Sequence, residues 1–121
     1  MNDEFKKEKL FQDGMRLFRE KDYFEAHEAW EDLWSDYYLE DRKFIQALIQ
    51  LAVSFVHLNN GNLKGAKSLL NKSKEKFKLF SGVHRGIDLK ILMITIERVS
   101  QSYNNLDDIR NFDWNIVPNL E

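Results

Sequence analysis

The fold is decided by residues 44–58, which read Phe44-Ile45-Gln46-Ala47-Leu48-Ile49-Gln50-Leu51-Ala52-Val53-Ser54-Phe55-Val56-His57-Leu58, the only long run of the chain without a charged residue. At about 100° per residue, its large apolar side chains fall on two faces of a helix, and a helix that is apolar on two faces is normally buried by neighbours on both sides. The run is shorter than the roughly 20 apolar residues needed to cross a bilayer. We therefore expect the central helix of a soluble helical domain, with a polar third stripe formed by Gln46, Gln50 and His57.

The composition sets limits on location and partners. The 121 residues suit one domain spanning 1–121, and there is no cysteine that could form a disulfide. A formal charge of −2 gives no electrostatic reason to expect nucleic acid or an anionic membrane as a partner. The first ten residues are charged throughout, unlike a signal peptide, so the expected location is cytoplasmic.

Four further helices are predicted around the central one. Their periodicity predicts helices over about 3–20, 23–38, 62–80 and 88–103, with a loop at 81–86 and an extended tail over about 105–121 packed on the bundle. Ile91 and Ile94 fall outside the inward stripe of the last helix, so they meet a second neighbour or form a patch for a homo-oligomer. The fold class is therefore all-α, a compact bundle of about five helices.

The first four helices carry an internal repeat. At a shift of 40 residues Ala26 falls on Ala66, Trp30 on Leu70, and the small residue Gly14 on Ser54. A small residue lets two antiparallel helices approach, and a large one fills the groove beside it, which is similar to the tetratricopeptide pattern. Because two αα-hairpins are fewer than the roughly three repeats a free solenoid needs, we expect them to be closed by the C-terminal helix.

A histidine and a glutamate in the second helix are candidates for metal binding. His27-Glu28 begins like the zinc motif His-Glu-x-x-His, but Glu31 stands where the second histidine would be. His27 and Glu31 lie four residues apart on one flank of the helix, and His57 of the next helix would be a third ligand of a divalent metal. With Glu28 as the general base, this set would form the open site of a metal-dependent hydrolase. His84 is expected far away, in the loop.

The same residues have two other interpretations. His27 and Glu31 could satisfy Gln46, Gln50 and His57 in a buried hydrogen-bond network that fixes helix register. Alternatively, a polar pocket between the second and third helices could bind a small molecule or a protein. The residues that would line it are His27, Glu28, Glu31, Trp34, Gln50 and His57. No nucleophile elbow or Walker loop is present. The balance favours a non-enzymatic binding or interaction module that needs no cofactor, with the hydrolase as the alternative.

The motifs also resemble a known family. Tyr23-Phe24-Glu25-Ala26-His27-Glu28-x-Trp30-Glu31-x-x-Trp34, Leu48-Ile49-Gln50-Leu51-Ala52 and His57-x-x-x-Gly61-Asn62-x-x-Gly65-Ala66 are similar to the domain-of-unknown-function 309 family, which consists of small all-helical and mostly bacterial proteins. The likeness extends to Gly86-Ile87-Asp88 and Pro118, and so covers nearly the whole chain. It implies a compact helical bundle and no particular reaction. The family's motif residues correspond to Tyr23, Phe24, His27, Glu28, Trp30, Glu31, Trp34, Gln50, His57 and Asn62.

Overall fold

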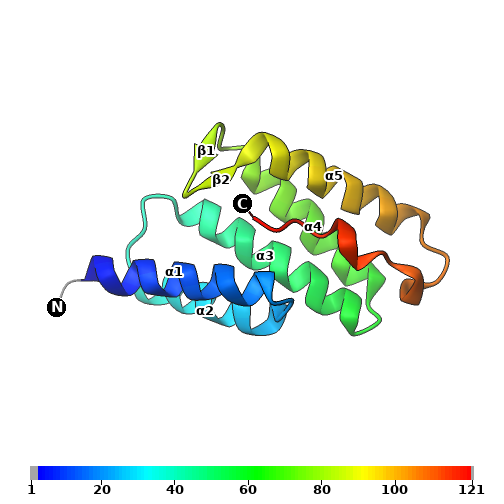
Figure 1. Ribbon diagram of the computed structural model, residues 1–121, viewed down its shortest axis with the longest axis horizontal. Helices are drawn as coiled ribbons and strands as arrows, with labels where there is room; N and C mark the ends of the chain where they lie inside the picture. The colour runs from blue at the N-terminus through cyan, green and yellow to red at the C-terminus, as the bar shows by residue number, and fades with distance from the viewer. Residues whose placement is uncertain (1–2, 121) are drawn as a thin grey trace.

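The computed structural model describes residues 3–120 and shows an all-α bundle (Figure 1). Its helices are α1 (Asp3–Arg19), α2 (Tyr23–Asp36), α3 (Arg42–Asn59), α4 (Leu63–Phe77) and α5 (Leu89–Asn105). A two-stranded antiparallel hairpin, β1 (Val83–His84) and β2 (Ile87–Asp88), lies between α4 and α5. The predicted fold class and its five helices are confirmed.

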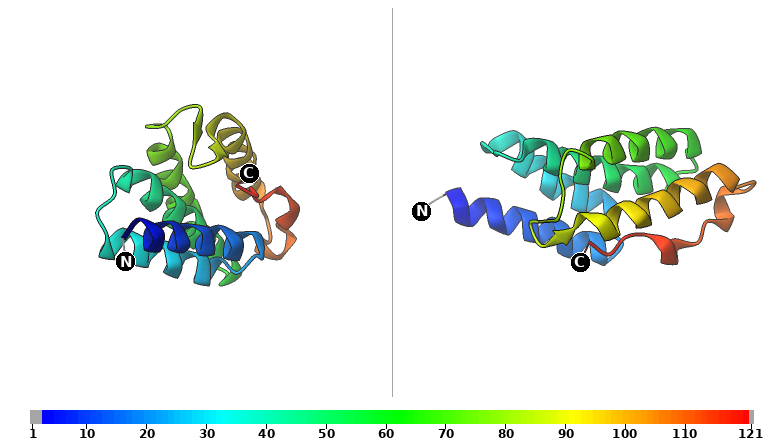
Figure 2. Two further views of the ribbon diagram at one scale, coloured as in Figure 1. Left: turned by 60° about the vertical axis from the view of Figure 1, so that its left-hand side comes forward. Right: turned by 90° about the horizontal axis from the view of Figure 1, so that it is seen from above.

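Helix α3 is the centre of the bundle, as its sequence predicts. It lies between the α1–α2 hairpin on one side and α4 on the other, with α5 packed beyond α4 (Figures 1 and 2). Its buried residues cover most of its circumference: they are Phe44, Ile45, Ala47, Leu48, Ile49, Leu51, Ala52, Ser54, Phe55 and Leu58. The two helix pairs therefore share one apolar core built around α3.

The repeat predicted from the 40-residue shift appears in the turns of both hairpins. Lys21 and Gly61 have positive φ angles of 67° and 77°, and the next residue caps the following helix in each hairpin. The Asp22 carboxylate accepts from the Glu25 N–H at 3.3 Å, and the Asn62 side chain accepts from Gly65 N–H at 2.8 Å. A left-handed residue followed by an Asx cap is a standard way to end one helix and begin the next.

Small residues bring the paired helices together. Gly14 lies under the indole of Trp30, whose Nε1–H donates to the carbonyl of Phe11 at 3.2 Å. In the second hairpin the hydroxyl of Ser54 donates to the carbonyl of Ala66 at 2.7 Å and lies 2.9 Å from the Tyr103 hydroxyl on α5. Ser54 thus joins three helices in the core.

The tail packs on the bundle but is not simply extended. It forms two short 3₁₀ turns, Ile109–Asn111 and Trp114–Ile116, each begun by an aspartate that caps it. The Trp114 ring stacks on Tyr23 with centroids 5.9 Å apart, and Arg19 donates to the carbonyls of Asn119 and Leu120 at 3.1 and 3.2 Å. The tail therefore runs back between α1 and α5 (Figure 1).

The largest difference from the sequence prediction lies at 81–86. Helix α4 ends at Phe77 rather than near residue 80, and part of the predicted loop forms the β1–β2 hairpin. Arg85 and Gly86 have φ angles of 49° and 78° at its turn, and two consecutive positive φ angles are what a tight two-residue hairpin requires. Strands of two residues have too few positions to show an alternating pattern, so no periodic signal marks them in the sequence.

Two predictions concern the cellular compartment and self-association. Within residues 3–120 no helix combines the length and hydropathy needed to cross a membrane, and the compartment stays a prediction. Ile91 and Ile94 are 58% and 59% exposed on α5. Self-association through this helix also stays a prediction.

Candidate functional site

A cluster of Asp41, His84 and Arg85 joins the start of α3 to the β hairpin. Arg85 Nε lies 2.5 Å from Asp41 Oδ2, and Arg85 Nη2 donates to Asp41 Oδ1 at 3.0 Å. His84 Nε2 lies 2.8 Å from Asp41 Oδ2, so both carboxylate oxygens are occupied. The sequence predicts His84 in the loop after the fourth helix, away from His27 and His57. It does not predict the contact with Asp41, which lies 43 positions earlier.

Aromatic rings hold this cluster in place. The His84 ring lies 4.4 Å from the Phe44 ring centroid and 5.0 Å from that of Phe80, while the Arg85 guanidinium lies 4.8 Å over Phe11. Stacking of a guanidinium on a ring and packing of an imidazole between two rings both restrict side-chain rotation. The cluster is therefore a rigid joint between α1, α3 and the hairpin.

The Asp41 carboxylate is ionised in this setting. Burial acts to raise its pKa, but hydrogen bonds from Arg85 and His84 and the charge on those groups together hold the pKa below its usual value of 3.8. Because an ionised carboxylate only accepts hydrogen bonds, His84 Nε2 carries a proton in this contact. Asp41 makes no side-chain cap to α3, since its oxygens serve the hairpin instead.

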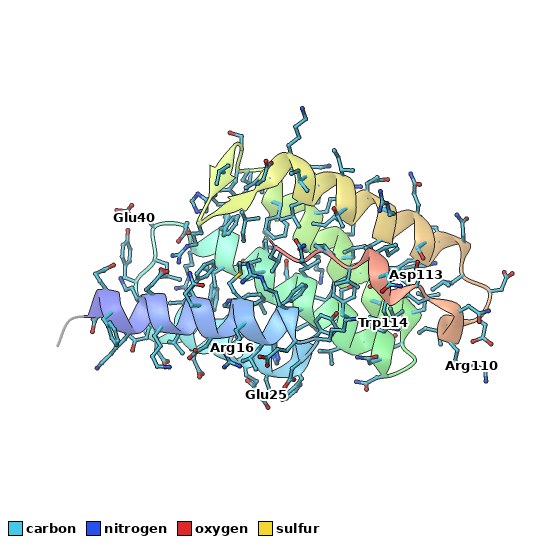
Figure 3. All side chains as sticks on the ribbon, in the orientation of Figure 1. Arg16, Glu25, Glu40, Arg110, Asp113 and Trp114 are labelled. Atoms are coloured by element: carbon cyan, nitrogen blue, oxygen red, sulfur yellow. The ribbon has the colours of Figure 1, made fainter. Side chains whose placement is uncertain are left out.

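Two open clefts lie around this joint and share Glu40, Asp41 and Phe80. The larger, about 830 Å³, is lined by Glu4, Lys7, Glu8, Tyr38, Leu39, Glu40, Asp41, Phe80, His84 and Arg85. The smaller, about 450 Å³, is lined by Trp34, Glu40, Asp41, Arg42, Lys43, Gln46 and Phe80. Glu40 projects at the end of the molecule where the α2–α3 connection lies (Figure 3). We call the larger one the end cleft.

The carboxylates of the end cleft differ in their partners. Glu4 pairs with Lys7 at 3.2 Å, and Asp41 pairs with Arg85. Glu8 accepts from the neutral amide of Gln12 at 2.9 Å, so no cation balances its charge in that contact. Glu40 is exposed and has no hydrogen bond or ion pair within residues 3–120. The end cleft therefore carries two carboxylates, Glu8 and Glu40, that have no cationic partner among the described residues.

Comparison with known proteins finds a family that part of this chain resembles. Residues 11–69 match the model of a family described as "Domain of unknown function (DUF309)". This part of the chain is similar to the DUF309 family. The match confirms the resemblance seen in the sequence over the second half of α1, all of α2 and α3, and the first half of α4. Within the cluster, Asp41 lies inside the DUF309 match, whereas His84 and Arg85 lie outside it.

A curated relative is also described without an activity. The "Uncharacterized protein YpuF" of Bacillus subtilis (strain 168) is 35% identical over 69 residues, which are 56% of this chain and 38% of that protein. The similarity thus spans well under half the length of that relative. Its description names no activity.

The side-chain hydrogen bonds of His27 and His57 within the described residues are local and do not join α2 to α3. His27 Nδ1 lies 2.9 Å from the carbonyl of Phe24, and His57 Nδ1 accepts from the Asn62 side chain at 3.4 Å, so each imidazole is bonded within its own hairpin segment. Gln50 Oε1 is buried and has no partner among the described residues. Short local contacts, three to five residues away, engage the Nδ1 atom of each histidine.

The predicted metal site is also not assembled. Within residues 3–120 no group of three or more His, Asp or Glu side chains is arranged to hold a metal ion, so His27, Glu31 and His57 do not come together as ligands. Both histidine rings are turned toward their local partners, and Glu28, the predicted general base, is exposed on α2. The i, i+4 spacing puts His27 and Glu31 on one flank of α2, but it contains no information about the direction of the His57 side chain on α3.

Trp34 is the member of the predicted pocket that lines one of the two clefts. The Arg42 guanidinium lies 3.8 Å over its ring and donates to its backbone carbonyl at 2.9 Å. The indole Nε1–H is buried without an acceptor within the described part of the chain. His27, Glu28, Glu31, Gln50 and His57 line neither cleft. Sequence reasoning missed Asp41, His84 and Arg85, for which the available signals were an Asp before a long helix and an Arg-Gly turn.

Proposed function

We propose that this chain is a non-enzymatic binding module whose binding site is the end cleft. The observation that carries the proposal is the Asp41 joint, which fixes three separate segments around one concave surface. Ligand sites are concave and combine apolar walls with a few well-positioned polar groups. The end cleft has this lining, with Phe80 and Leu39 beside charged side chains from α1, the α2–α3 connection and the hairpin.

The chemistry of the lining supports binding over catalysis. Asp41 has both oxygens engaged and a lowered pKa, whereas a general base works best with a pKa near the working pH. His84 uses one ring nitrogen on Asp41 and is packed between two phenylalanine rings. No Ser, Thr or Cys side chain is among the described residues that line the end cleft. The groups present are suited to recognition of charge and shape.

The proposed site lies away from the pocket predicted between α2 and α3. Of the six residues predicted for that pocket, Trp34 alone lines one of the two clefts, and the adjoining smaller cleft connects it to the proposed site through Glu40, Asp41 and Phe80. The expectation of a binding module is therefore kept, while its location is moved to the end of the bundle.

A titration followed by NMR tests the proposal. Isotope-labelled protein would be titrated with three blocked pentapeptides of equal length, Gly-Arg-Gly-Arg-Gly, Gly-Glu-Gly-Glu-Gly and Gly-Gln-Gly-Gln-Gly. We expect at least one of them to shift the amide signals of Leu39, Glu40 and Arg85 in a saturable way. The Arg85→Lys variant, which keeps the charge but loses the two-pronged contact with Asp41, should weaken that response. If none of the peptides shifts these signals, the proposal is overturned.

A further inference from the structure

The charge of the end cleft identifies a class of occupant. We infer that the end cleft receives a protein segment carrying an arginine or lysine side chain, which Glu40 and Glu8 attract and aromatic rings hold. This inference rests on the proposed function, because it names the partner of the same cleft. Charge balance, the aromatic lining and the size of the cleft support it.

The charge balance favours a cation. Both cationic side chains that line the cleft, Lys7 and Arg85, already pair with carboxylates, namely Glu4 and Asp41. The charges of Glu8 and Glu40 are then left without a cationic partner at the rim. Complementary charge speeds encounter and excludes wrong partners, so an anionic segment would be repelled and a cationic one steered in.

The aromatic lining gives a second, separate reason. At this end of the bundle the chain already places its own guanidinium groups on aromatic rings: Arg42 lies 3.8 Å over Trp34, and Arg85 lies 4.8 Å over Phe11. Tyr38 lines the cleft with 77% of its surface exposed, and its ring packs on no other ring or cation among the described residues. A guanidinium or ammonium group on a tyrosine face is a favourable contact.

The size of the site favours a segment over a single small cation. A cleft of about 830 Å³ is in the range that encloses a drug-sized ligand, and it continues into the smaller cleft through shared residues. Trp34 and Arg42 line the smaller cleft, with the Arg42 guanidinium 3.8 Å over the Trp34 ring. A peptide lying across both clefts would therefore pass over this pair as well as over Tyr38.

A charge-reversal pair tests the inference. Glu40→Lys removes the free carboxylate of the cleft, and Glu25→Lys makes the same charge change on α2, at a position away from Glu40 (Figure 3). Neither side chain makes a hydrogen bond or ion pair within residues 3–120, so both variants should fold, which circular dichroism would verify. The probe is the blocked pentapeptide Gly-Arg-Gly-Arg-Gly, with affinity measured from the NMR shifts of the cleft residues.

We expect Glu40→Lys to weaken binding of the arginine peptide about tenfold, which corresponds to about 1.4 kcal/mol of lost attraction. The control variant Glu25→Lys should leave the affinity for this peptide within about twofold of the wild-type value. Equal weakening by both variants would mean that only the overall charge matters, and the inference would be overturned. If the glutamate or glutamine peptide shifts the cleft signals and the arginine peptide does not, the inference fails while the binding module stands. If no peptide shifts them, both proposals fail.

Discussion

The indole of Trp30 lies directly against Gly14, so close that a Cβ atom on Gly14 would stand 2.1 Å from Trp30 Nε1. The indole cannot easily retreat, because its Nε1–H donates to the Phe11 carbonyl at 3.2 Å and the residue is fully buried. The contact fixes the distance between α1 and α2. It is the first hairpin's equivalent of the contact that Ser54 makes with α4 in the second.

Gly14→Ala should therefore destabilise the protein despite the better helix propensity of alanine. We expect a loss of about 1–3 kcal/mol in the free energy of unfolding, the usual cost of overpacking a core. Urea denaturation would measure it. In a Trp30→Leu background, which copies the residue found at Leu70 in the second hairpin, Gly14→Ala should lower the free energy of unfolding much less. An equal loss in both backgrounds would contradict the assignment of strain to the Gly14–Trp30 pair.

Asp41→Asn should weaken the joint and alter the pH dependence of stability. Replacing the carboxylate removes charge-assisted bonds to Arg85 and His84, and we expect a loss of about 1–2 kcal/mol at neutral pH, since water reaching the cleft screens part of the interaction. Denaturation at several pH values would measure the difference between the variant and the wild type.

The sign of that pH effect follows from the lowered pKa of Asp41. A depressed folded-state pKa means that the ionised carboxylate stabilises the folded protein above its unfolded value of about 4, and that this contribution fades as pH falls through the folded value. The gap between wild type and Asp41→Asn should thus be constant from neutral pH to about pH 5 and shrink below about pH 4. A gap that widens on acidification would contradict the assignment.

Ser54→Ala and Tyr103→Phe should differ in cost. The Ser54 hydroxyl has one hydrogen, which it gives to the Ala66 carbonyl, so the Tyr103 hydroxyl must donate to Ser54. Tyr103→Phe then removes one bond, at about 1 kcal/mol, whereas Ser54→Ala leaves a buried phenol unpaired, at about 1–3 kcal/mol. Guanidinium denaturation of both single variants and the double variant would measure these losses. It would also show whether the double variant loses less free energy of unfolding than the sum of the two single variants.

Trp114→Ala should expose Tyr23 to water. Burial raises the pKa of Tyr23 to about 12, and the Trp114 ring is part of that cover. We expect the pKa to fall toward 10 in the variant and the protein to lose about 2 kcal/mol, below the cost of emptying a fully buried tryptophan site. NMR titration of labelled tyrosine rings would measure the pKa of Tyr23. Trp114→Phe is the control, because it keeps an aromatic ring in place.

The raised pKa of Tyr23 also has a consequence for alkaline stability. Because the folded state holds the phenol neutral, its contribution is complete below the unfolded pKa near 10 and is lost as pH rises from about 10 to about 12. The wild type should lose stability in this window faster than Tyr23→Phe. Equal slopes for the two proteins would show that Tyr23 does not titrate with unfolding.

Much of the architecture could be predicted because it depends on local pattern. The uncharged run at 44–58 is apolar around most of a helix, so it has to be the central element, and it is. The turns at Lys21-Asp22 and Gly61-Asn62 follow from cap chemistry that acts over three or four residues. The site was harder, because the spacing of His27 and Glu31 says which flank they share but not what their side chains meet.

Helical periodicity and capping are encoded within a few neighbouring residues, so the sequence is enough to predict that the chain is helical, where its helices lie and how two hairpins repeat. Three features appear only when the helices pack: Asp41 meets His84 and Arg85, the buried Ser54 hydroxyl is paired while Gln50 Oε1 has no partner among the described residues, and the concave surface lies at the end of the bundle. These contacts join residues many positions apart, and their geometry depends on how every helix packs, which no local pattern records.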